Sequence, residues 1–394
     1  MAIGVRRLAM WLVPLALGGL PCGPLGCEPE PIDVVTPPPP GTGGSTPYDG
    51  GPDDAAVDAG DDAEPPPDAA PHPVLVGLDP NPRSPDGGPP GAAELLEAEL
   101  TCRAVGVRTI VLLAPWNTLG DETIPALGAR VASYRSQGLT VVLNVAVVDR
   151  KLDYRPAAVQ GLAWDAGGTT DAMAATLDAL VPALGADLGA LVLGRETDRY
   201  VLEHPDEATG LTQFLALGVS RVASMGADAP PVGVGLSFAG ADPPASYQAL
   251  LGLGALAVYT YLPGIGAPSV PSDTSVTHDL DAMITLGAGR PVVLEAAGLT
   301  SSAALGSSPE QQRQFLDALF GALGARRAHF SVVNVHELHD GTASSCAAEA
   351  AAQGEPPDGS VAAYACETGL RAPDGGAKPA WQGFVQGAAA FASP

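Results

Sequence analysis

Basic residues are scarce in this sequence: 19 lysines and arginines stand against 44 aspartates and glutamates among 394 residues, giving a formal net charge of −25. The shortage makes nucleic-acid binding a poor candidate function, because affinity for phosphate backbones comes largely from clusters of basic residues. The apolar run near the N-terminus, residues 8–20, is shorter than the roughly 20 residues that a transmembrane helix needs. Hydrophobic residues still make up 46% of the chain, which excludes wholesale disorder.

The first 27 residues have the pattern of a secretory signal. Arg6 and Arg7 precede the apolar run, and Cys27 follows it closely. The stretch Pro24-Leu25-Gly26-Cys27 resembles a bacterial lipoprotein box, in which a small residue precedes a cysteine that becomes lipidated. Proline departs from that pattern, so lipidation of Cys27 and plain cleavage both stay open. We expect an exported protein, either extracellular or held at the cell surface by a possible lipid anchor.

Residues 28–73 have the composition of a spacer. They contain 13 prolines and 11 carboxylates but no lysine or arginine. Proline favours extended backbone and like charges repel, so this segment is predicted to be a disordered, semi-stiff acidic linker. A linker between an anchor and a folded domain fits a protein tethered to a surface.

From residue 74 onward, short apolar runs alternate with amphipathic stretches. Eight runs are candidate strands: Val74–Leu78, Thr109–Ala114, Thr140–Val148, Leu188–Gly194, Pro231–Phe238, Ala255–Tyr261, Pro291–Glu295 and Phe330–His336. Seven stretches are candidate helices: Ala92–Val105, Ile124–Gln137, Thr170–Leu184, Thr212–Ser224, Ser246–Leu251, Val276–Leu286 and Pro309–Leu323. Such alternation indicates a parallel sheet covered on both faces. Eight units in this length predict an α/β fold, a (β/α)8 TIM barrel over residues 74–394.

An open doubly wound sheet is the alternative, and its characteristic turn is missing. A glycine-rich, phosphate-binding turn should follow the first strand, but residues 77–82 contain two prolines there. The glycines at 252 and 254 precede a strand rather than open a helix. The barrel is therefore favoured, with no nucleotide cofactor indicated.

Two glutamates lie where barrel active sites form, at the carboxyl ends of strands. Glu196 follows the fourth predicted strand, and Glu295 ends the seventh. A buried glutamate is costly unless its charge is compensated or its pKa shifts. Two such groups facing each other across the barrel mouth suit retaining glycoside hydrolysis, in which one acts as acid/base and the other as nucleophile.

Several short sequence motifs, which occur in the order of the predicted barrel strands, resemble those of clan A retaining glycoside hydrolases, notably the endo-β-1,4-galactanase-like ones. They are Gly194-x-Glu196-x-Asp198 with Tyr200, Thr260-Tyr261-Leu262-Pro263, residues 291–295 with Gly298 and Ser301-Ser302, Ser307-Ser308-x-x-Gln311-x-x-x-Phe315, and residues 368–371 with Asp374-Gly375 and Lys378–Trp381. The resemblance spans nearly all of residues 74–394. It implies a hydrolase that acts on a poly- or oligosaccharide, as a monomer and without a cofactor.

Carried over by position, the resemblance assigns roles to four residues. Glu196 would be the general acid/base and Glu295 the nucleophile, which requires a raised pKa for the first and an ionised second. Tyr261 would donate a hydrogen bond to Glu295 and hold it for attack. Trp116, after the second strand, would offer an aromatic platform to a sugar ring.

Arg195 departs from the family pattern, which has asparagine before the acid/base. An arginine would stabilise ionised Glu196 and so lower the pKa of the group that should stay protonated. Either the substrate differs, with an anionic sugar as one option, or the enzyme is impaired. Three readings follow: a retaining glycosidase, an impaired barrel that binds carbohydrate at the surface, and a structural protein whose glutamates are merely solvated.

The remaining signals concern the end of the last strand. His336-Glu337-Leu338-His339 is one residue short of the His-Glu-x-x-His zinc motif and follows a strand, so His336 is predicted to contact substrate rather than a metal. Cys346 and Cys366 share one predicted long loop, where a disulfide is plausible in an exported protein. Cys102 is predicted to be a buried free thiol.

Overall fold

The computed structural model describes residues 73–83, 90–238, 240–267, 269 and 275–391. The predicted signal segment at 1–27, the lipidation site at Cys27 and all of the predicted linker except Pro73 lie outside the described residues. Within the described part, no helix is both long enough and apolar enough to cross a membrane.

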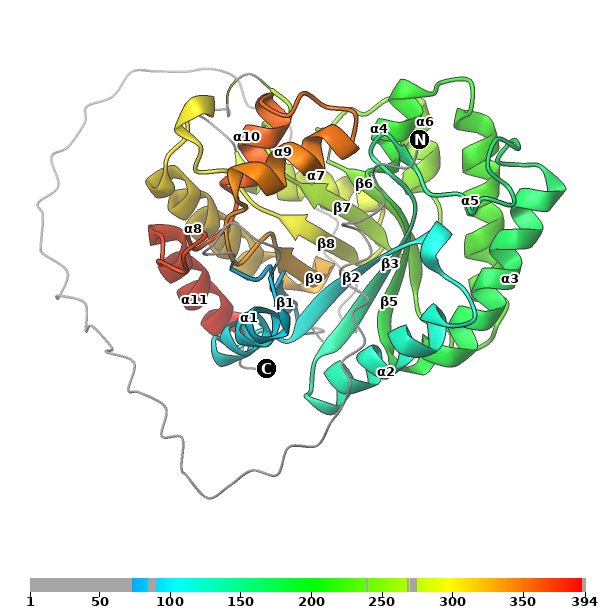
Figure 1. Cartoon of the computed structure of the whole chain (residues 1–394), viewed down its shortest axis with the longest axis horizontal. Coiled ribbons are helices and arrows are strands. Elements are labelled where there is room, and N and C mark those ends of the chain that lie inside the picture. Colours follow the sequence, from blue (N-terminus) through cyan, green and yellow to red (C-terminus); the bar gives the residue numbers. More distant parts are fainter. Residues whose placement is uncertain (1–72, 84–89, 239, 268, 270–274, 392–394) are drawn as a thin grey trace, which may run out of the picture. The chain divides into compact units, whose positions relative to one another are not determined.

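Eight parallel strands close into a barrel, which confirms the predicted (β/α)8 TIM-barrel fold (Figure 1). Each strand pairs with its neighbours in chain order, and the first pairs with the last. The barrel strands are β1 (Leu75–Leu78), β2 (Thr109–Pro115), β3 (Thr140–Asp149), β5 (Leu188–Arg195), β6 (Val232–Ser237), β7 (Ala257–Tyr261), β8 (Val292–Ala297) and β9 (Phe330–Val335). A short strand, β4 (Leu152–Asp153), folds back antiparallel onto β3.

Helices surround the barrel. The predicted ones are present as α1 (Ala92–Ala104), α2 (Thr123–Ser136), α3 (Gly167–Leu184), α5 (Ala208–Ala223), α6 (Ala245–Leu251), α7 (Val276–Gly287) and α8 (Pro309–Ala325). Further helices are α4 (Thr197–Glu203), α9 (Ala343–Ala352), α10 (Ser360–Cys366) and α11 (Pro379–Phe391). Short 3₁₀ turns are η2 (Trp116–Thr118), η3 (Gly185–Asp187), η4 (Ala303–Leu305) and η5 (Arg327–His329).

The strands read as continuous apolar runs because both of their faces are buried. Alternate side chains fill the barrel interior, and the others pack against the helices. The interior cluster consists of Val142, Ala190, Val192, Leu256, Val258, Val293 and Val332. Toward the carboxyl ends of the strands, the side chains inside the barrel are polar instead of apolar. The candidate site lies at this end.

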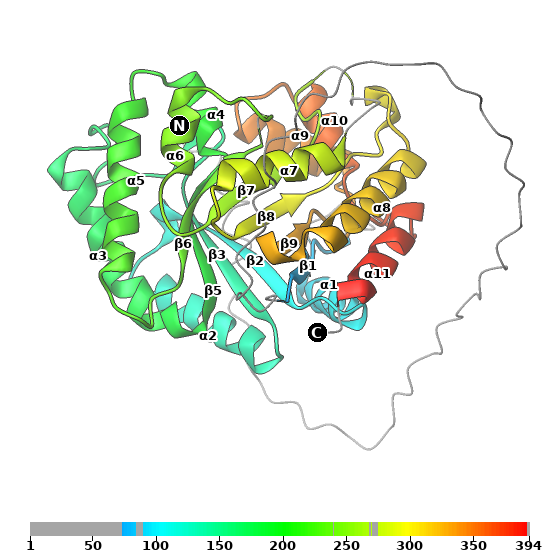
Figure 2. The same ribbon diagram turned by 180° about the vertical axis from the view of Figure 1, so that it is seen from behind.

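The segment after β9 is not one long loop, as predicted, but carries two helices. The predicted disulfide between Cys346 in α9 and Cys366 at the end of α10 is present. Cys102 is a buried free cysteine, as expected. The chain then ends in α11, which lies beside α8 with Phe384 and Phe391 against Phe320 (Figure 2).

Candidate active site

Glu196 lies immediately after β5, at the barrel mouth, and is only 2% exposed. Its backbone is left-handed, with φ of 43°, a conformation that costs energy in a residue other than glycine and is concentrated at functional sites. Oε2 forms an ion pair with Arg150 Nε at 3.0 Å. Oε1 is buried and has no hydrogen-bond partner among the residues that the structure describes.

Glu295 lies in β8 and is 3% exposed. The pairing register of β8 shifts against both neighbouring strands at this residue, an irregularity that re-aims side chains beside active sites. Asn144 Nδ2 donates to Glu295 Oε2 at 2.7 Å, and Thr260 Oγ1 donates to Oε1 at 3.2 Å. Asn144 Nδ2 also donates to the carbonyl oxygen of Gly194 at 3.0 Å, so one amide joins the strand that ends at Glu196 to Glu295.

Burial and nearby charges shift the pKa values of both glutamates. Burial alone would raise the pKa of Glu196, but Arg150 and Arg195 hold it below its usual value. Burial raises the pKa of Glu295 to about 7; Arg195 and the Asn144 hydrogen bond oppose this rise, while the charges of Asp149 and Glu196 add to it. This order is the reverse of the one that the resemblance requires.

Arg195 is predicted to stabilise ionised Glu196, and its charge does lower the pKa of that glutamate. Its Nη1 also lies 3.7 Å from Asp149 Oδ2. The cation that binds Glu196 directly is Arg150, at the turn between β3 and β4. That turn is therefore part of the site.

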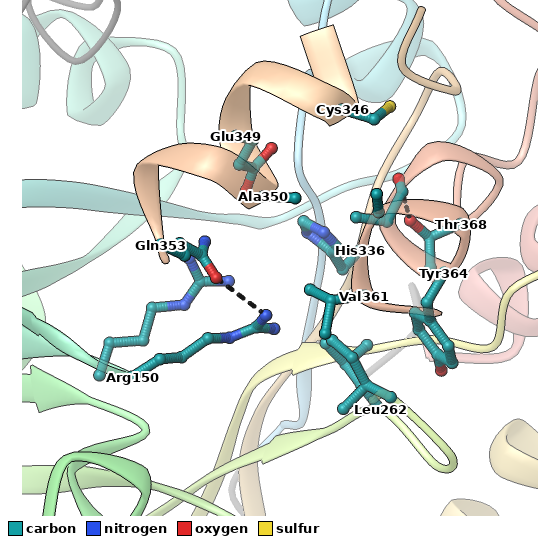
Figure 3. Close-up of a pocket in the computed structure, with 14 residues that line it drawn as sticks. Arg150, Leu262, His336, Cys346, Glu349, Ala350, Gln353, Val361, Tyr364 and Thr368 are labelled. Atoms are coloured by element: carbon teal, nitrogen blue, oxygen red, sulfur yellow. Dashed lines mark hydrogen bonds between the residues drawn. The ribbon is translucent and has the colours of Figure 1, made fainter. Parts of the chain in front are cut away.

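A cavity lies beside Arg150 and Arg195, and neither Glu196 nor Glu295 is among the residues that line it (Figure 3). Arg150, Arg195 and His336 line it from the strand ends, and side chains of α9 and α10 line the opposite side. His336 Nδ1 lies 2.9 Å from Asp79 Oδ2. Burial would lower the pKa of His336, but the carboxylates of Glu337 and Asp79 raise it, which favours the protonated ring.

Two predicted substrate-site residues lie elsewhere. Trp116 is fully buried, with its indole N–H donating to Thr176 and its ring against Phe214, so it belongs to the helix layer and offers no platform to a sugar. Tyr261 donates to Asp279 in α7 rather than to Glu295. The neighbouring Thr260 bonds Glu295 instead, because successive side chains of a strand point to opposite faces.

Several site residues were missed at the level of the sequence. Asn144 and Asn334 are fully buried in otherwise apolar strands, and a polar residue in such a run was the available signal. Asn334 Nδ2 donates to Asp79 and to the carbonyl oxygen of Glu295. Gln353, the residue after α9, had no sequence signal. Among the described residues, no group of three or more His, Cys, Asp or Glu side chains is arranged to hold a metal ion.

Three solved structures with a similar fold are glycoside hydrolases. A GH5_18 variant from Bifidobacterium longum, in complex with Manβ1-4GlcNAc, is 14% identical with a TM-score of 0.61, over 81% of this chain and 79% of that one. A GH5_18 variant from Streptomyces cattleya with the same sugar is 15% identical with a TM-score of 0.63, over 81% of each chain.

A third neighbour is the exo-β-1,4-mannosidase Op5Man5 from an Opitutaceae bacterium, 15% identical with a TM-score of 0.60; the match covers 80% of this chain and 59% of that one. At such identities the likeness shows the fold. No family model and no curated protein matches the sequence.

Proposed function

We propose that this protein is an exported glycoside hydrolase that cleaves an oligosaccharide by a retaining, two-glutamate mechanism. The observation that carries the proposal is the buried pair itself: Glu196 after the fourth barrel strand, ion-paired with Arg150, and Glu295 in the seventh, held by Asn144. A protein bears the cost of burying two carboxyls where they perform chemistry. The fold neighbours, which are glycoside hydrolases, support the same class.

In the first step, a Glu295 oxygen attacks the anomeric carbon and the glycosidic bond breaks. The proton of Glu196 passes to the departing oxygen, so an alcohol leaves and a glycosyl ester on Glu295 forms. In the second step, the Glu196 carboxylate takes a proton from water, whose oxygen attacks the same carbon and releases Glu295. Asn144 and Thr260 hold the Glu295 carboxylate by two hydrogen bonds, which orient it for attack.

The pKa order in the unliganded site limits this reaction. Glu196 must carry a proton in the first step, yet Arg150 and Arg195 favour its ionised form. Glu295 must be ionised, yet burial raises its pKa to about 7. The productive state, with the proton on Glu196 and Glu295 ionised, is therefore a minor one unless substrate displaces Arg150. This observation favours a second candidate function, an impaired barrel that binds carbohydrate without cleaving it.

The test compares the full-length protein with Glu196→Gln and Glu295→Gln on 2,4-dinitrophenyl and alkyl glycosides of mannose, galactose, glucose and glucuronic acid. We expect Glu295→Gln to lose activity with every leaving group, because the nucleophile is removed, and Glu196→Gln to lose about 10²–10⁴-fold with the alkyl glycosides, whose leaving group needs a proton. Glu196→Gln should lose far less glycosylation rate with the dinitrophenyl glycoside, because that leaving group needs no proton. Exposed Glu122, with no side-chain cap on α2, supplies the matched control Glu122→Gln.

The outcomes separate the candidate functions. Equal rates in parent and both variants would overturn the retaining pair. Carbohydrate binding without turnover by the parent would favour the impaired barrel. A glucuronide as the best substrate would agree with the cations Arg150, Arg195 and His336 on the cavity wall.

A further inference from the structure

The cavity is roofed by a single disulfide-closed segment, here named the cap: α9, residues 353–359 and α10. Cys346 and Cys366 join its two ends. Gln353, Glu349 and Ala350 from the α9 side line the cavity, as do Val361, Ala362 and Ala365 from α10. In Figure 3 the α9 side chains approach the same space as Arg150 and His336. The cap therefore forms one wall of the cavity.

Two adjacent cations fasten the cap to the barrel. Arg150 Nη1 donates to Gln353 Oε1 at 3.2 Å, and Lys151 Nζ lies 2.8 Å from Glu355 Oε1. The same two residues also contact the segment after β5, since Arg150 binds Glu196 and Lys151 lies 3.3 Å from Glu203. The Arg150–Lys151 turn thus joins the cap to the strand end that carries Glu196.

The base of the cap is fixed from the opposite side. Tyr364 in α10 is fully buried, and its hydroxyl donates to the carbonyl oxygen of Gly298, just after β8, at 3.1 Å. Together with the disulfide, this contact holds α10 over the strand that carries Glu295. The cap therefore covers the cavity at the strand ends, and Arg150 in the wall of that cavity is ion-paired with Glu196.

We infer that the cap makes the site a blind pocket that accepts the terminal sugar of a chain and excludes a polymer running through it. A chain cleaved internally needs an open groove on both sides of the cleaved bond, and a cap held at the Glu196 end of the site by Arg150 and Lys151 would close one of those sides. The inference rests on the proposed function and adds the substrate class: short oligosaccharides or chain ends, cut to release a monosaccharide.

The test uses β-1,4-linked manno-, gluco- and galacto-oligosaccharides of two to six sugars, labelled at the reducing end with 2-aminobenzamide. The products that the full-length protein forms are separated by chromatography at early times and identified by mass spectrometry. We expect free monosaccharide and a labelled product one sugar shorter from every substrate that is cut. Labelled fragments from internal bonds at first turnover would overturn the inference while leaving the proposed function standing.

If none of the oligosaccharides is cut, the proposed hydrolysis fails, and calorimetry with the same compounds tests the pocket alone. Affinity that does not grow beyond two sugars would support a blind pocket. Affinity that rises with each added sugar, or no binding at all, would overturn it.

A variant adds an independent readout. Gln353→Ala with Glu355→Ala removes both cap fastenings, and we expect it to lose single-sugar specificity, with internal products or length-dependent affinity gained. Glu310→Ala with Gln314→Ala is the matched control, because it removes exposed contacts of Glu310 on α8, away from the cavity. Unchanged products in the cap variant would count against the cap as the wall that sets substrate length.

Discussion

Arg150 occupies an unusual position for a single side chain, because it contacts both a candidate catalytic carboxylate and the cap. Its own φ is 55°, a left-handed conformation that a residue other than glycine adopts at a cost. Its Nε holds Glu196, and its Nη1 holds Gln353. Removing the charge of Arg150 should therefore change the pKa of Glu196 more than that of any other group in the site.

We predict that Arg150→Met raises the pKa of Glu196 and changes the pH profile of kcat/KM. The reactive pair carries one proton between the lowered pKa of Glu196 and about pH 7, where Glu295 loses its proton. A higher pKa for Glu196 moves the acid limb to higher pH. It also raises the maximum, because each unit by which that pKa rises multiplies the productive form by about ten.

Two variants separate charge from packing in this experiment. Arg150→Lys keeps the charge and should keep the acid limb near the parent's. Gln353→Ala breaks the contact with the cap but leaves the Arg150–Glu196 pair in place, so its acid limb should also stay. An acid limb that does not move in Arg150→Met would contradict control of Glu196 by Arg150.

At this scale the sequence predicted the two glutamates but not their neighbours. Glu196 and Glu295 were recognisable because each ends an apolar run. Thr260 and Tyr261 are adjacent, and the resemblance selected Tyr261, whereas the barrel turns Thr260 toward Glu295. Trp116 follows a strand end as predicted, but its side chain turns outward into the helix layer. Side-chain direction at a strand end depends on the local backbone, which composition does not specify.

At the scale of elements, the strands were predictable and the cap was not. All eight barrel strands lie within the predicted runs or extend them by one or two residues, because burial on both faces leaves continuous apolar sequence. The α9 sequence, Ala-Ser-Ser-Cys-Ala-Ala-Glu-Ala-Ala-Ala, has small side chains with little apolar periodicity. Glycine and proline at 354–359 further favoured a loop. Only the cysteine pair indicated that this segment is held in place.

We predict that the double variant Cys346→Ser, Cys366→Ser loosens the cap and leaves the barrel folded. A disulfide that closes a loop of 20 residues stabilises by about 3 kcal/mol through the entropy of the open chain. The loss should be local, because the cap is an appendage to a closed sheet. Hydrogen exchange should accelerate across residues 343–366 and stay slow in β3 and β8.

Cys102→Ala provides the comparison, since this buried thiol is on the inner side of α1, in the hydrophobic core, and is a free cysteine. We expect that variant to weaken the barrel core without loosening the cap. Faster exchange throughout the barrel in the double serine variant would contradict a local role for the disulfide.

At the scale of the whole molecule, the pattern of the first 27 residues predicts where the protein is delivered. We predict that the full chain is exported and loses its apolar N-terminal segment. Mass spectrometry of the mature N-terminus, with fractionation of the producing bacterium, measures both. Cys27→Ala distinguishes the two routes, because it blocks processing and membrane attachment of a lipoprotein but leaves plain cleavage intact. An intact N-terminus in the cytoplasm would contradict export.

The placement of the aromatic side chains has a practical consequence for spectroscopy. Of the tryptophans in the described residues, Trp116 and Trp164 are buried in the helix layer, and Trp381 lies on α11 beside Phe384. None of them lines the cavity beside Arg150 and Arg195. Intrinsic fluorescence of the barrel therefore reports whether the helix layer is intact, and a sugar can fill the site without changing the emission.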